Sequence, residues 1–336
     1  MKDKRPVIGI TMGDPVGVGP EIILSALADD TLYTVCTPLV LGDAAWLAAV
    51  ARRLKRPVQI RTIEDTSAGS GAPGIINILN LSSLDPNTLH WGRPTVETGK
   101  AMVRYITTAV DMALRGDIAA IVTCPINKKA MEDAGYHYNG HTELLAEKTH
   151  TAKYAMMLAG DKLRVVLVTI HTALRQVPGQ ITPEAVLDTI RITSDALSRR
   201  FGMPRPRIAV AALNPHAGEG GMFGDEEKTL IEPAIDRALR ENLEVTGPHP
   251  PDTVFYHAAN GRYDAVVSMY HDQGLIPFKM LHFTDGVNTT LGLPVIRTSV
   301  DHGTAYDIAG KGLADPGSLM AAVRMAVHQA VHAINA

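Results

Sequence analysis

The stretch DAVVSMYHDQG, residues 264–274, decides the fold, because a run of apolar and small side chains passes directly into a polar cluster. A short run of this kind, rich in β-branched residues, predicts a buried strand of a parallel sheet. The stretches RVVLVTIH at 164–171 and IAVAALNPH at 208–216 have the same layout. Each of the three predicted strands is followed at its carboxyl end by a histidine, namely His271, His171 and His216.

Ligands of open α/β sheets bind outside the carboxyl ends of the strands, and histidine is the commonest metal ligand. We therefore expect His171, His216 and His271 to form a divalent-metal site. Zn²⁺ would suit three imidazoles with an open position, whereas Mg²⁺ or Mn²⁺ would prefer added oxygen ligands such as Asp272. For any one of these residues alone, among 13 histidines, a hydrogen-bonded structural imidazole is the simpler interpretation.

The bulk composition is that of a globular protein and excludes several classes of function. The chain has 336 residues, 46% hydrophobic and 20% charged, with a net charge of -3, which argues against a nucleic-acid or polybasic membrane surface. Only two cysteines occur, Cys36 and Cys124, so no disulfide framework is expected. Residues 1–11 contain no long apolar segment, so we expect no secretion signal, and no apolar run approaches the roughly 18 residues of a membrane helix. We expect a cytoplasmic protein with no membrane or nucleic-acid partner.

Predicted strands alternate with predicted helices along the chain, which indicates an α/β fold with mostly parallel sheets covered by helices. Further strands are expected at 7–11, 38–41, 74–79 and 118–123, and helices at 22–28, 44–53, 96–114 and 183–199. Gly116 can end the helix at 96–114.

The glycine-rich turn GDPVGVGPE at 13–21 follows the first predicted strand. Its glycine spacing matches neither the Rossmann nor the Walker fingerprint. Two interpretations stay open: a tight connection that places Pro20 in the first helical turn, or a functional loop.

Several polar residues indicate an anionic substrate. His141 and Thr142 stand at the start of a predicted helix, where anions bind, although Thr142 could instead cap that helix. Lys279, Asn288 and Arg297 follow downstream. Cations near a metal site suit a phosphate or carboxylate, while their alternative is a solvated surface charge. Arg297 lies inside an apolar run, where a charge needs a partner.

The stretch HGTAYDIAGKGLADP at 302–316 resembles the adenosine-binding loop of isopropylmalate and isocitrate dehydrogenases, which bind NAD without a Rossmann fingerprint. The chain as a whole resembles the 4-hydroxythreonine-4-phosphate dehydrogenase family. The motifs that carry this resemblance are GDPVGVGPE from 13, NGHTELLA from 139, LNPHAGEGG from 213, YHDQG from 270 and GVNTTLGLPVIRTSVDHGTA from 286.

The resemblance implies two α/β/α domains with a central cleft. Residues 1–127 plus 296–336 would carry the adenosine loop, and 128–295 the metal and substrate ligands and the dimer interface. It also implies a homodimer with its active site at that interface. The implied residues are His171, His216 and His271 for the metal; His141, Thr142, Lys279, Asn288 and Arg297 for the substrate; and Gly292, His302, Gly303, Thr304 and Asp307 for NAD. Asp272 and Lys279 are candidates for catalysis because they lie close in sequence to His271.

The family reaction oxidises a secondary alcohol with NAD and then releases CO₂ from the β-keto acid, in vitamin B6 (pyridoxine) biosynthesis. The loop MFGDEE at 222–227 lacks the histidine usual in the biosynthetic enzymes. It resembles the loop of the branch that acts on D-threonate or D-erythronate 4-phosphate, and on this loop we favour that branch. A further branch oxidises aromatic cis-dihydrodiols, but His141 and Thr142 suit a phosphorylated substrate. Alternatives of other classes are a metal-dependent hydrolase and a non-catalytic metabolite-binding protein.

Overall fold

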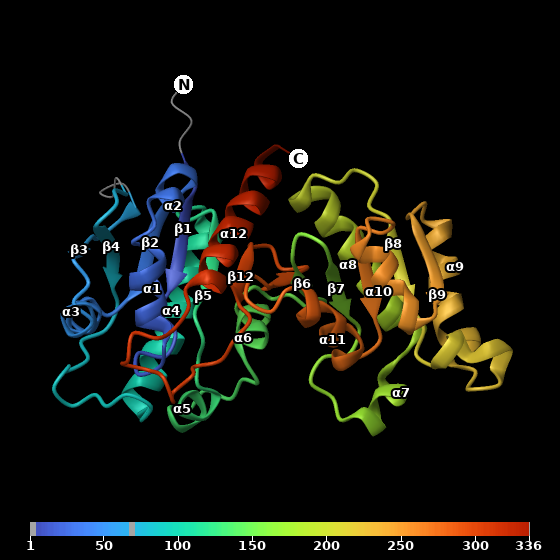
Figure 1. Ribbon diagram of the computed structural model, residues 1–336, viewed down its shortest axis with the longest axis horizontal. Helices are drawn as coiled ribbons and strands as arrows, with labels where there is room; N and C mark the ends of the chain where they lie inside the picture. The colour runs from blue at the N-terminus through green and yellow to red at the C-terminus, as the bar shows by residue number, and fades with distance from the viewer. Residues whose placement is uncertain (1–4, 67–70, 336) are drawn as a thin grey trace. The chain divides into compact units, whose positions relative to one another are not determined.

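Strands and helices alternate through two units in the computed structural model, which describes residues 5–66 and 71–335 (Figure 1). Unit 1 comprises Met1–Ala152 and Leu293–Val331, and unit 2 comprises Lys153–Gly292 and His332–Ala336. Each unit has a sheet of mostly parallel strands with helices packed against it. The predicted α/β class is confirmed.

The strands of unit 1 are parallel throughout. Their order is β3 (Gln59–Thr62), β4 (Ile75–Asn80), β2 (Thr37–Gly42), β1 (Val7–Thr11), β5 (Ala120–Thr123) and β12 (Arg297–Val300). Parallel pairing puts the carboxyl ends of all these strands at one edge, where the loops that follow them gather. The expected strands at 7–11, 38–41, 74–79 and 118–123 correspond to β1, β2, β4 and β5.

The helices of unit 1 are α1 (Gly19–Ala26), α2 (Asp30–Val35), α3 (Ala44–Arg53), α4 (Val96–Arg115), α5 (Lys128–Asp133), α6 (His141–Lys148) and most of α12 (Gly317–Asn335). The long helix α4 packs on β1, β2 and β5 through one buried face that includes Tyr105. A capping box between Thr95 and Thr98 begins α4, and Gly116, with φ of 79°, ends it as expected.

The sheet of unit 2 is mixed. Its order is β11 (Val287–Leu291), β6 (Ala155–Ala159), β7 (Arg164–Leu167), β10 (Ala265–Ser268), β8 (Ile208–Ala211) and β9 (Val245–His249). The pairs β11–β6 and β6–β7 are antiparallel, and the pairs from β7 to β9 are parallel. The sequence analysis did not predict β6 and β11 as strands, and so did not predict the antiparallel pairs that β6 makes.

The helical segments of unit 2 are η2 (Leu174–Gln176), α7 (Val177–Gln180), α8 (Pro183–Phe201), η3 (Pro215–Gly221), η4 (Glu227–Ile231), α9 (Glu232–Arg240), α10 (Pro251–Ala259) and α11 (His271–Leu281). Adjacent side chains of β10 point to opposite faces. Val267 packs in a cluster with Ile190 of α8, and Val266 packs in another with Phe278 of α11. The sheet therefore has helices on both faces. Within the described ranges, no helix is long and apolar enough to cross a membrane.

The glycine-rich turn at 13–21 is a tight connection that also anchors a second loop. Pro20 stands in the first turn of α1, as a tight connection requires. Glu21 follows it and is only 1% exposed, and its carboxylate accepts hydrogen bonds from the backbone amides of Gly310 and Gly312, the latter at 2.7 Å. The turn therefore also holds the loop that resembles an adenosine-binding loop.

Two more contacts fasten the same loop. The Val18 amide donates to the Thr304 carbonyl at 3.0 Å, and the Tyr306 hydroxyl donates to the buried carboxylate of Asp14. Burial raises the pKa of Asp14, and the hydrogen bond from Tyr306 opposes that rise. The loop is thus tied to the turn at both of its ends.

Replacing Glu21 by Ala is expected to lower the free energy of unfolding by about 2–4 kcal/mol, because the buried amide of Gly310 and the partly buried amide of Gly312 lose their acceptor. Urea denaturation measures the change. Glu64→Ala, at an exposed position, is the matched control and should stay within about 0.5 kcal/mol of the parent protein. Equal midpoints for the two variants would contradict the anchoring role of Glu21.

Candidate functional site

The three strands that precede the histidines are parallel neighbours in the order β7-β10-β8. Val266 of β10 lies opposite Val165 of β7 on one side and Ala209 of β8 on the other. The carboxyl ends of the three strands therefore lie side by side at one edge of unit 2. This arrangement places three histidine-bearing segments at the position where α/β sheets bind ligands.

The ends of these strands are bonded to one another through Met269. Its carbonyl accepts from the side-chain hydroxyl of Thr169 at 2.7 Å, and its amide donates to the Gln273 side chain at 2.7 Å. The same Gln273 side chain donates to the Ala212 carbonyl at 2.6 Å. The sequence analysis did not identify Gln273. The signal that could have identified it is its position, because it is a polar residue in the first turn of a helix that follows a buried strand.

His171 and His271 face one another, with ring centroids 5.6 Å apart. Two imidazoles bound to one Zn²⁺ at about 2.1 Å would have their ring centroids roughly 5–6 Å apart, so the pair fits a shared metal. Nδ1 of His271 is hydrogen-bonded to the Asp272 carboxylate at 2.7 Å, which leaves Nε2 for a ligand. The two rings border a cavity of about 430 Å³ lined by Ile170, His171, Thr172, Leu174, Val177, Tyr270, His271 and Asp272.

His216 lies on a different kind of backbone. Residues 216–220 all have left-handed dihedral angles, including φ of 52° at His216 and 44° at Glu219. Its ring neighbours Phe223, with centroids 6.3 Å apart. In the described part of the chain, no three His, Cys, Asp or Glu side chains are grouped so as to hold a metal. A single chain thus brings together His171 and His271 but does not add His216 to them.

Glu227 holds the segment that leads to His216. Its buried carboxylate accepts from the amides of Leu213 and Asn214, at 2.8 and 2.7 Å, and from the Asn214 side chain at 3.0 Å. A Cβ at Gly218 would lie 2.8 Å from the same carboxylate, so the loop wraps closely around it. These bonds satisfy amides at the point where the strand has ended, and they support the left-handed run.

The remaining predicted residues of unit 2 lie on neighbouring elements. Lys279 is half-buried on α11, the helix that His271 begins, and Asn288 is half-buried on β11 opposite Leu158 of β6. Gly292 directly follows β11, is exposed and has φ of 85°.

In unit 1, His141 and the loop after β12 border one cavity of about 170 Å³. Its lining residues are Thr123, Cys124, Pro125, Ile126, Lys128, Gly140, His141, Ser299, Val300, His302 and Gly303. Two sets of residues predicted separately, one for substrate and one for cofactor, therefore meet here. Lys128 was missed, although a lysine pair after a strand and a proline was a visible signal.

Thr142 does not cap α6. The helix begins at His141, its N-cap is Gly140, and no side chain bonds to the amides of the first turn. The capping interpretation of Thr142 is therefore wrong, and this helix end keeps its amides for a ligand.

His141 is a neutral imidazole with an available acceptor. Burial, with smaller contributions from the cations of Arg297 and Lys128, holds its pKa well below the usual range. One ring nitrogen is bonded to the Cys124 carbonyl, and Nε2 is buried without a hydrogen-bond partner. Because the donating nitrogen is then Nδ1, Nε2 carries a lone pair that can accept a hydrogen bond or take up a proton.

Arg297 is only 3% exposed, and its guanidinium donates to the Thr123 hydroxyl at 2.8 and 3.2 Å. Burial lowers the pKa of Arg297 to about 9, so it remains a cation at pH 7. A buried cation carries a desolvation cost that an arriving anion would offset. Thr123 belongs to the wall of the His141 cavity, so this charge lies directly behind that wall.

Four of the five predicted cofactor residues lie on the loop held by Glu21, and the fifth, Gly292, lies after β11 in unit 2. His302, Gly303 and Asp307 are exposed, and Thr304 is half-buried. Nδ1 of His302 is hydrogen-bonded to the Gly303 carbonyl at 3.0 Å. The exposed carboxylate of Asp307 has the chemistry that recognises ribose hydroxyls. The exposed face of this loop therefore fits a nucleotide.

A mixed α/β fold with histidine-lined cavities at the carboxyl ends of its strands defines the chain as an α/β enzyme. The family described as "Pyridoxal phosphate biosynthetic protein PdxA" matches residues 34–326. A 4-hydroxythreonine-4-phosphate dehydrogenase of Desulforapulum autotrophicum is 59% identical over 330 residues, which cover 98% of this chain and 97% of that one. The chain belongs to the PdxA family, as the sequence motifs predicted.

Two further relatives extend the comparison. A D-threonate 4-phosphate dehydrogenase of Salmonella typhimurium is 47% identical over 325 residues, covering 96% of this chain and 98% of the relative. The crystal structure of a 4-hydroxythreonine-4-phosphate dehydrogenase from Klebsiella pneumoniae has a TM-score of 0.91 at 44% identity, covering 97% and 99%. The prediction that the chain is an oxidoreductase acting on a CH–OH group is confirmed by these relatives.

His141 should make the protein less stable in acid. Its pKa in the folded state lies below the unfolded value of about 6.5, so only the unfolded chain binds this proton as the pH falls from 7 toward 5. Stability should therefore fall with falling pH, by at most about 1.4 kcal/mol per pH unit from this group. His141→Gln should flatten the dependence in urea denaturation, whereas His137→Gln, at an exposed position, should keep the parent slope. Equal slopes for all three proteins would contradict the buried neutral state.

Proposed function

We propose that this protein catalyses the NAD-dependent and divalent-metal-dependent oxidation and decarboxylation of a 4-phosphorylated C4 3-hydroxy acid. One observation carries the proposal: the cavity lined by His141 is also lined by His302 and Gly303 of the adenosine-type loop. Hydride transfer requires that substrate and cofactor share one space, and here the two predicted sets of residues border the same one.

The metal would be held by His171 and His271, whose rings have the spacing of a shared metal. His216 would complete the site from a second copy of the chain, since one chain does not assemble the three. The end of α11, the helix that begins at His271, supports a homodimer, because Met280 in its last turn and Phe283 just after it are 81% and 80% exposed. Large exposed apolar side chains next to a ligand-binding residue suit an interface between subunits.

The chain's own residues would bind and orient the substrate. Arg297, Lys128 and the start of α6 supply positive charge for phosphate and carboxylate groups. Nε2 of His141 can take a proton when an anion arrives and raises its pKa. Asp272 holds His271 through Nδ1, and Lys279 is the acid or base that we propose for proton transfer. When bound, the metal would supply Lewis-acid stabilisation of the substrate oxygen, and NAD would accept the hydride.

The substrate that we place first is 4-hydroxy-L-threonine 4-phosphate, because the relative with 59% identity carries that name and the D-threonate enzyme shares 47%. The loop at 222–227 favours D-threonate or D-erythronate 4-phosphate instead. His216 and Phe223 are ring neighbours, so this loop belongs to the surroundings of the proposed metal site. Both substrates undergo the same reaction class.

Chelation should abolish NADH formation, and added Zn²⁺, Mg²⁺ or Mn²⁺ should restore it. His271→Ala should lower kcat by about 100-fold or more and weaken metal binding in equilibrium dialysis, because it removes a ligand. His137→Ala, at an exposed position, is the control with unchanged activity. Full turnover by the chelated protein would overturn the metal proposal, and substrate hydrolysis without NADH formation would favour a metal hydrolase.

The two substrate assignments predict opposite ratios of kcat/KM. Measured side by side, 4-hydroxy-L-threonine 4-phosphate should exceed D-threonate and D-erythronate 4-phosphate by about tenfold or more, since a site built for an amino group discriminates against its absence. The reverse ratio would assign the protein to sugar-acid catabolism and leave the reaction class intact. No turnover of any of the three would count against the proposed function.

A further inference from the structure

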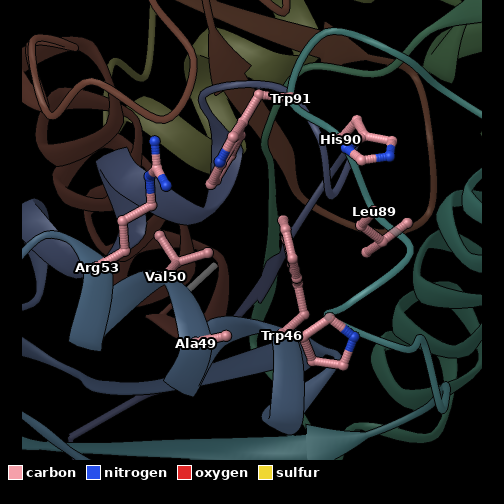
Figure 2. A pocket seen from close by; sticks show the side chains of 8 residues that line it. Trp46, Ala49, Val50, Arg53, Leu89, His90 and Trp91 are labelled. Atoms are coloured by element: carbon pink, nitrogen blue, oxygen red, sulfur yellow. The ribbon is translucent and has the colours of Figure 1, made fainter.

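A separate cavity of unit 1 lies between α3 and the segment that leads toward α4. Its volume is about 270 Å³, and we call it the tryptophan cleft (Figure 2). Its lining residues are Trp46, Ala49, Val50, Arg53, Pro86, Leu89, His90 and Trp91. Trp46 and Trp91 are the only two tryptophans of the chain, and their ring centroids lie 5.2 Å apart at 43°. None of these residues was assigned a role by the sequence motifs.

The walls of the cleft are fixed by hydrogen bonds. The Trp46 indole donates to the Pro15 carbonyl at 2.6 Å. The fully buried carboxylate of Asp43 accepts from the Trp46 amide at 2.9 Å and from the Leu84 amide at 2.8 Å. One carboxylate thus holds both the helix and the segment that form the two walls. A site built in this way needs little ordering when a ligand binds.

The cleft borders the loop that Glu21 anchors. A Cβ at Gly310 would lie 2.7 Å from three atoms of the Trp91 indole, so the ring packs directly on this glycine backbone. Nε of Arg53 donates to the Gly310 carbonyl at 3.3 Å. Gly92, next to Trp91, lies against Tyr306, with its ideal Cβ position 3.3 Å from the Tyr306 Cβ. The tryptophan cleft and the adenosine-type loop are therefore one continuous surface.

The chemistry of the cleft combines aromatic and cationic groups. Figure 2 shows Arg53 rising from α3 beside the Trp91 indole, with Leu89 and His90 on the other side of the two indoles. Among the described residues, no carboxylate pairs with Arg53, and its side chain is exposed. A neutral apolar ligand would leave the cation unused, and a simple anion would leave the aromatic surface unused. A purine nucleotide uses both, through stacking and through its phosphate.

We propose that the tryptophan cleft binds the adenine ring of the dinucleotide, stacked on Trp91, with Arg53 contacting the adenosine phosphate. The assignment rests on the proposed NAD dependence and adds the residues that would hold the adenine end. The nicotinamide end would then extend along the loop to His302 and Gly303, which border the His141 cavity. The loop between Gly303 and Gly310 thus connects the two binding regions of the cofactor.

The fluorescence of the full-length protein tests this assignment directly, because both of its tryptophans line the cleft. AMP and ADP-ribose should change the tryptophan emission on titration, and nicotinamide mononucleotide should not. Trp91→Leu should raise the Kd for AMP by about tenfold or more in calorimetry, because the adenine ring loses its stacking partner. Trp91→Phe should recover most of the affinity. Equal Kd values for the parent protein and Trp91→Leu would overturn the proposal.

Arg53 gives a second test that does not disturb the packed indoles. Arg53→Ala should weaken AMP binding and leave adenosine binding unchanged, whereas Arg52→Ala, its exposed neighbour outside the cleft, should alter neither. AMP binding that does not compete with NAD would also overturn the assignment. Competitive AMP binding without NADH formation on any substrate would support the cleft and refute the proposed function. NADH formation together with unchanged AMP binding in Trp91→Leu and Arg53→Ala would support the proposed function and refute the assignment of the cleft.

Discussion

Backbone amides of the connecting loops have no partner in a sheet and need other hydrogen-bond acceptors. In this protein buried carboxylates supply several of these acceptors. Glu21, Asp43 and Glu227 are nearly inaccessible to solvent, and each accepts from two amides. An unsatisfied buried amide costs about 1–3 kcal/mol, so each carboxylate fixes its loop in one conformation. The loops that carry the adenosine-type motif, the tryptophan cleft and His216 all depend on such an anchor.

The same arrangement leaves the side chains of the candidate sites available. The anchors bond to the backbone of the loops, so His302, Asp307 and Arg53 keep their polar groups at the surface. His141 is the extreme case, since its ring is held through one nitrogen and the other has no partner. Rigid loops with exposed polar side chains suit the binding of a small anionic molecule, because little ordering remains to be done on binding.

Local patterns predicted the α/β class, the strands before the three histidines and the long helix ending at Gly116, because these features depend on periodicity and on single capping residues. They could not predict that Glu21 bonds to Gly310, or that Gln273 bridges two strands. Such contacts join residues far apart in the chain, and their sequence signal is a single polar residue. The left-handed run that begins at His216 could not be predicted either, since most of its residues are not glycine, the residue type that readily adopts such a backbone.

The backbone after each strand decides which histidines meet. His271 begins α11 almost directly after β10, and its ring reaches that of His171 beyond the neighbouring strand β7. The strand before His216, β8, is also a neighbour of β10. A connection after β8 as short as the one after β10 would therefore be expected to place the His216 ring near the other two. Glu227 instead bonds to Leu213 and Asn214, a left-handed run follows at 216–220, and the His216 ring packs near Phe223. The conformation of the loop after β8, and not the order of the strands, separates His216 from His171 and His271 within a single chain. This separation is the geometric reason for proposing that a second chain completes the site.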